Sequence, residues 1–183
     1  MKFDQLLTIL KTTIGKRKVV ELGKIVAESE FSMEELIDLT LHKDDQIGFR
    51  AAWILEQIYS NDNNRFIPFT TYFLDRFSIQ NNLSARRHYA KILAFMTSRK
   101  APFQLKQLIK AYDTDLIVET VFSWVIDEKV PVAVKSQCLN VLGNLYPKHD
   151  WIKVELLETM DFLVDKESIA FYAKVKQIKK QLK

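Results

Sequence analysis

Glycine and proline are scarce in this chain, with four of each among 183 residues. A β-sandwich or barrel needs many tight turns, and tight turns depend on these residue types, so an all-β fold is disfavoured. Collagen-like and wholly disordered chains are excluded too, because 48% of the residues are hydrophobic. The composition therefore favours a packed, all-helical protein.

Cysteine occurs only as Cys138, which excludes an internal disulfide and favours a reducing, cytoplasmic location. The three histidines show no spacing typical of a zinc site, and no glycine-rich phosphate loop is present. We therefore predict no metal site, no cofactor and no catalytic residue. We also predict no membrane association, because no apolar run approaches the roughly 18 residues of a membrane span.

Lysine and arginine exceed aspartate and glutamate by 27 to 23, which gives a net charge of +4. This mild excess permits an anionic partner without requiring one. Nucleic acid therefore stays open as a partner beside protein or peptide.

Apolar residues recur every three or four positions through nearly the whole chain, and short polar clusters interrupt them. This pattern predicts consecutive amphipathic helices over residues 2–14, 18–29, 33–42, 45–60, 65–78, 83–97, 102–112, 114–128, 131–146, 151–164 and 167–182. Pro68 is expected in the first turn of its helix, or else at a kink or a later helix start. Ser32 and Asp150 are predicted helix N-caps.

One spacing of apolar side chains, with steps of four, three, one and three residues, returns along the chain. It selects Ile47, Ala51, Ile54, Leu55 and Ile58, then Ala85, Tyr89, Ile92, Leu93 and Met96, and then Val134, Cys138, Val141, Leu142 and Leu145. A fourth copy, Phe171, Val175, Ile178 and Leu182, is interrupted at Lys179. The copies begin at residues 47, 85, 134 and 171, so the intervals are 38, 49 and 37 residues. Such intervals are typical of two-helix HEAT or armadillo units, and an inserted helix at 102–112 accounts for the longest.

The stretch DQIGFRAAWILE at 45–56 resembles the second helix of a HEAT-like repeat. In the carboxyl half, WVIDEKV at 124–130, KSQ at 135–137 and DWIKVELL at 150–157 resemble short HEAT-like proteins of Bacteroidetes-type bacteria. The resemblance implies a right-handed α-α superhelix of about four to five helix pairs, forming a single domain over residues 1–183. That group has no established activity, so the resemblance implies a fold and no reaction.

In solenoids that resemble this chain, the second helix of each pair lines the concave surface. Side chains opposite the repeated apolar stripe are therefore the candidate binding residues. This reasoning predicts a binding ridge made of Phe49, Trp53, Arg86, Arg87, Lys91 and Asn140. The same positions allow an alternative, in which Phe49 and Trp53 pack under the first helix of their own repeat.

The leading hypothesis is a non-enzymatic binding or scaffold module that holds a protein or peptide partner on the ridge. The alternative is a DNA-binding protein or a HEAT-like alkylpurine DNA glycosylase. Such enzymes hold the damaged base in a basic groove, with Trp and Asp side chains around it. In this chain Trp124 and Asp127 are the candidates for those side chains. A self-associating scaffold is a third reading, for which the sequence offers no heptad seam.

Overall fold

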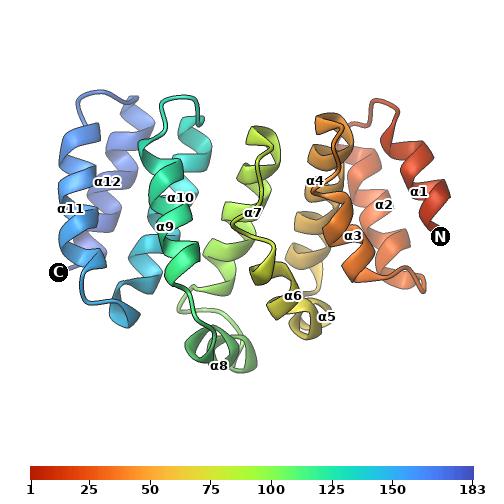
Figure 1. Ribbon diagram of the computed structural model, residues 1–183, viewed down its shortest axis with the longest axis horizontal. Coiled ribbons are helices and arrows are strands. Elements are labelled where there is room, and N and C mark those ends of the chain that lie inside the picture. Colours follow the sequence, from red (N-terminus) through yellow and green to blue (C-terminus); the bar gives the residue numbers. More distant parts are fainter. The chain divides into compact units, whose positions relative to one another are not determined.

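The computed structural model describes residues 1–183 as helices joined by turns, without a β-strand (Figure 1). The first helices are α1 (Phe3–Leu10), α2 (Lys16–Glu28), α3 (Met33–Leu39), α4 (Asp45–Asn61), α5 (Asn63–Phe66), the 3-10 helix η1 (Ile67–Phe69) and α6 (Thr70–Asp75). They are followed by α7 (Leu83–Met96), α8 (Phe103–Ala111), α9 (Asp115–Ile126), α10 (Val132–Leu145), the 3-10 helix η2 (Tyr146–Lys148), α11 (Ile152–Leu163) and α12 (Ile169–Gln181). The prediction of an all-helical fold is confirmed.

The predicted helix over 65–78 is divided into α5, η1 and α6, because proline has no N–H to donate inside a helix. Pro68 lies in η1 and α6 begins at Thr70, so the later helix start is the alternative that is confirmed. Asp150 is not an N-cap, since α11 begins after Trp151 and no side chain caps it. The Ser32 cap is confirmed, because its Oγ accepts a hydrogen bond from the Glu35 N–H at 3.3 Å.

The chain forms two compact units, Met1–Ile92 and Leu93–Lys183, with the boundary inside α7. In the first unit α4 packs against α1, α2 and α3, and in the second α10 packs against α9, α11 and α12. Each central helix is thus covered by the first helix of its own pair and by the second helix of a neighbouring pair. This is the packing expected of stacked two-helix repeats.

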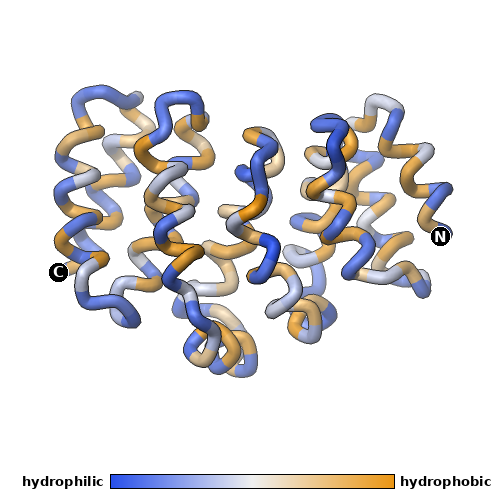
Figure 2. The backbone as a smooth tube through the Cα atoms, in the orientation of Figure 1, coloured by the Kyte–Doolittle hydropathy of each residue, from blue (hydrophilic) through white to orange (hydrophobic).

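The repeated apolar stripe forms the core of both units. None of its members, from Ile47 in α4 to Leu182 after α12, is more than 3% exposed. Figure 2 shows the corresponding alternation of hydrophobic and hydrophilic turns along the helices. Burying one such aliphatic side chain stabilises a fold by about 1.5–3 kcal/mol, so each repeat contributes several times that amount. Cys138 is fully buried within this stripe, as predicted.

Helix α4 is fixed by two contacts near its start. A Cβ atom at Gly48 would lie only 2.9 Å from the Thr40 carbonyl oxygen, so glycine permits the close approach of the preceding loop. Two residues later, the Arg50 Nη1 donates to the Leu10 carbonyl at 2.7 Å and holds the end of α1 against α4. These contacts set the orientation of α4 and of the side chains on its remaining face.

No helix in the structure is both long and apolar enough to cross a membrane.

Candidate binding pocket

The first unit contains a pocket of about 500 Å³ lined by side chains of α2, α4 and α7. Its walls are Lys16, Phe49, Trp53, Glu56, Gln57, Ser60, Arg87, His88 and Lys91. The three helices are the second members of consecutive predicted pairs. The pocket therefore lies on the helices that the repeat argument selects for binding.

Three rings form the apolar part of the wall. Phe49 and Trp53 are one turn apart on α4, with ring centroids 5.8 Å apart. His88 of α7 packs against both, with centroid distances of 5.5 Å to Phe49 and 6.1 Å to Trp53. Phe49 and Trp53 are only half-buried, so part of each ring remains accessible.

The Glu56 carboxylate joins α4 to α7. Its Oε2 lies 2.5 Å from His88 Nδ1, and its Oε1 accepts a short hydrogen bond from Lys91 Nζ. Burial by itself raises the pKa of Glu56, but hydrogen bonds and charge from His88 and Lys91 outweigh burial and lower it. Glu56 is therefore an ionised, fully engaged group inside the pocket.

The His88 ring leaves one nitrogen without a partner. A carboxylate only accepts hydrogen bonds, so Nδ1 carries the proton that faces Glu56. Nε2 is buried and has no hydrogen-bond partner, in a residue that is only 5% exposed. Such groups are rare in folded proteins because each costs a hydrogen bond.

The charge of the pocket is positive. Lys16 and Arg87 are exposed and make no ion pair, whereas Lys91 is paired with Glu56. Three cations thus face one carboxylate. An anionic group entering the pocket meets two positive charges that have no other partner.

Four of the six residues of the predicted ridge line this pocket: Phe49, Trp53, Arg87 and Lys91. Arg86 does not, since its Nε donates to the Gln80 carbonyl at 3.1 Å. Asn140 lies on α10 in the second unit, where its amide donates to Gln137 and accepts from Lys174.

Sequence reasoning missed Glu56, His88 and Lys16 as members of this site. The signal for the first two lies in the repeat interval. The cationic and imidazole partners of Glu56 occur 35 and 32 residues later, which is one or two turns short of the 38-residue interval. A carboxylate followed at that distance by basic residues marks contacts between neighbouring second helices.

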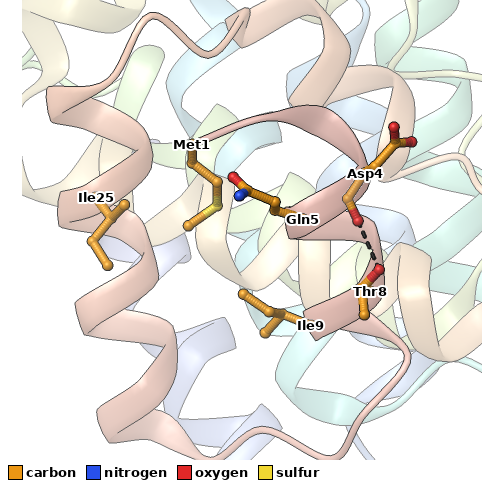
Figure 3. A pocket seen from close by; sticks show the side chains of 6 residues that line it. All are labelled: Met1, Asp4, Gln5, Thr8, Ile9 and Ile25. Carbon is orange, nitrogen blue, oxygen red and sulfur yellow. Dashed lines mark hydrogen bonds between the residues drawn. The ribbon is translucent and has the colours of Figure 1, made fainter.

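A second pocket, of about 660 Å³, lies between α1 and α2 and is lined by Met1, Asp4, Gln5, Thr8, Ile9 and Ile25 (Figure 3). Its polar groups bond within their own helix or its start: Thr8 Oγ1 donates to the Asp4 carbonyl at 2.8 Å, and Gln5 Oε1 accepts from the Lys2 N–H. Figure 3 shows the Asp4 carboxylate directed away from Ile25. This pocket has no set of converging polar groups that would recognise a ligand.

In the second unit, His149 lies between Asp115 and Thr114, with Nδ1–Oδ1 and Nε2–Oγ1 distances of 3.1 and 2.7 Å. This order resembles a hydrolase triad, but Thr114 is 1% exposed and its hydroxyl reaches no substrate. These contacts of His149 instead hold the start of α9 against the loop before α11. No three histidine, cysteine or carboxylate groups gather as ligands for a metal ion.

Trp124 and Asp127 are the candidate residues of the glycosylase alternative. Trp124 is 3% exposed in the core, and Asp127 Oδ1 accepts from the Lys129 N–H at the end of α9. Burial makes Trp124 inaccessible to a base, whereas Asp127 is half-buried. The structure therefore argues against the part given to Trp124, and the glycosylase alternative itself stays a prediction.

The HEAT repeat domain family matches the chain over residues 6–182. This chain belongs to the HEAT-repeat family. The resemblance noted in the sequence is confirmed, and the HEAT-repeat fold identifies the stacked helix pairs as those of an α-solenoid. No curated protein and no solved structure matches the chain.

Proposed function

We propose that this HEAT-repeat protein is a non-enzymatic binding module that holds a protein or peptide partner in the pocket lined by α2, α4 and α7. A repeat scaffold presents side chains from successive second helices on one surface, and here α2, α4 and α7 supply that surface. The proposal leaves the protein as a whole in the role that the sequence favours, a scaffold without catalytic residues.

The observation that carries the proposal is the half-buried Trp53 beside the unpaired cation Arg87 in one pocket. Tryptophan and arginine supply a large share of the binding energy at protein interfaces. A half-buried ring still has apolar area to lose to a partner, and an unpaired guanidinium has donors to offer.

The polar groups of the pocket support binding over catalysis. Glu56 and His88 are bonded to each other, and His88 is buried. Neither is therefore presented to a substrate as a free acid or base. Their bond fixes the wall against which Phe49 and Trp53 pack.

The proposal is tested with the full chain immobilised as bait in a lysate of the native cell. We expect a protein partner to be retained by the wild type and lost with Trp53→Ala. Trp151→Ala is the matched control, because Trp151 is 47% exposed and lies in the second unit. Helical circular dichroism must be unchanged in both variants.

Equal retention by wild type and Trp53→Ala would overturn the assignment to this pocket. If the retained material disappears on nuclease treatment, the partner is nucleic acid and not protein.

A further inference from the structure

We infer that the segment bound in this pocket is acidic: a peptide in which aspartate or glutamate stands beside an aromatic or aliphatic side chain. The inference rests on the proposed function of the same pocket and adds the chemistry of the partner. It follows from the unpaired charges and the accessible ring area of the pocket.

Charge complementarity selects an acidic partner. Lys16 on α2 and Arg87 on α7 line the pocket without an ion-pair partner. The carboxylate of Glu56 does not compensate them, because its two oxygens are occupied by His88 and Lys91. A carboxylate of the ligand pairs with Arg87 or Lys16, whereas a basic ligand is repelled by both.

The pocket wall also has an apolar part beside the cations. Phe49 and Trp53 lie 5.8 Å apart and are half-buried, so they offer a continuous apolar surface next to the cations. An apolar ligand side chain placed on these rings removes further apolar area from water. The pocket thus combines an anion site with an apolar site, and a short peptide can supply both.

The test measures binding of fluorescein-labelled peptides to the full chain by fluorescence anisotropy. One panel places each aromatic and aliphatic residue in turn between two glutamates. A matched panel carries glutamine in place of glutamate. We expect at least one acidic peptide to bind about tenfold more tightly than its glutamine match, with affinity falling as NaCl is raised.

Variants of the chain localise the effect. Arg87→Gln and Lys16→Gln are each expected to weaken the best acidic peptide several-fold and to reduce its preference over the glutamine match. Arg99→Gln is the matched control, because Arg99 is exposed and outside the pocket. Trp53→Ala is expected to weaken both members of the pair.

The outcomes separate the inference from the proposed function. If acidic and glutamine peptides bind equally and Trp53→Ala abolishes both, the binding pocket stands and the acidic partner is wrong. If no acidic peptide exceeds its match while Trp53→Ala still loses a cellular protein, the same conclusion holds. Tighter binding of a phosphopeptide or a single-stranded oligonucleotide than of any acidic peptide also overturns the inference.

Discussion

Glu56 on α4 and His88 on α7 are joined by a hydrogen bond of 2.5 Å between Oε2 and Nδ1. The bond links the second helices of two consecutive repeats in the first unit. The same two residues form part of the pocket wall, so this contact contributes both to packing between the repeats and to the shape of the pocket.

The first prediction concerns the pH dependence of this contact. The pKa of Glu56 is lowered from 4.5 in the folded protein, so ionised Glu56 adds stability above about pH 4.5 that is lost as the pH falls through the lowered pKa. We expect the free energy of unfolding to decrease less between pH 5 and pH 3 in Glu56→Gln than in the wild type, as measured by urea unfolding.

Asp161→Asn serves as the control for Glu56→Gln, because Asp161 is an exposed carboxylate whose partner Lys179 is also partly exposed. It should retain the wild-type pH dependence. Parallel curves for Glu56→Gln and the wild type would show that His88 and Lys91 do not lower the pKa.

The second prediction concerns a buried ion pair in the second unit. Lys135 Nζ lies 2.5 Å from Glu167 Oε1, and the lysine side chain is 1% exposed. Glu167→Ala leaves that ammonium buried without its counter-charge and should cost about 3 kcal/mol of unfolding free energy. Asp161→Ala breaks an exposed pair and should cost less than about 1 kcal/mol. Equal losses in urea unfolding would contradict the distinction.

The third prediction concerns the close approach at Gly48. An added Cβ would lie 2.9 Å from the Thr40 carbonyl oxygen, which is backbone and cannot rotate away. We expect Gly48→Ala to lower the thermal midpoint, with a loss of about 1–3 kcal/mol. At Gly23 the new Cβ would meet the flexible side chain of Gln57 at 3.2 Å, so Gly23→Ala should be nearly neutral. A Gly48→Ala protein as stable as Gly23→Ala would refute the steric account.

The fourth prediction concerns a buried phenol. Tyr89 Oη lies 2.5 Å from Thr40 Oγ1, which itself donates to the Ile37 carbonyl, so the tyrosine is the donor. Tyr89→Phe should cost about 1–2 kcal/mol in urea unfolding because Thr40 loses a donor. Tyr172→Phe, at a residue 45% exposed, is the control and should be nearly neutral.

The titration of the same phenol provides an independent measurement. Burial raises the pKa of Tyr89 to about 12. The neutral phenol therefore adds stability that is retained below pH 10 and is lost as the pH rises towards 12. Ultraviolet titration of the folded wild type should show tyrosine ionisation at high pH. The amplitude of this late absorbance change should be smaller in Tyr89→Phe.

The repeated stripe was predictable from the sequence because every copy must bury the same face against its neighbours. Ile47 and Leu145 are almost a hundred residues apart, yet both follow from one spacing. The break at Pro68 was only partly predictable. Periodicity continues through the proline, and the local loss of an N–H decides where the helix divides.

The pocket was half predictable for a related reason. A helical wheel places Phe49, Trp53, Arg87 and Lys91 on one face, and the structure gathers them in one pocket. A wheel does not predict where a long side chain ends, which is why Arg86 reaches back to the Gln80 carbonyl instead. His88 was missed because its role depends on a contact with Glu56 in another repeat.

The second position of the stripe has a different occupant in each copy: Ala51, Tyr89, Cys138 and Val175, all buried. These side chains differ widely in volume, so the neighbours of each copy have adjusted to its own size. A chain that folded out of register, with one repeat docked on the wrong neighbour, would set a tyrosine where there is room for a methyl group. The differences in side-chain volume therefore favour a single order in which the repeats pack on one another.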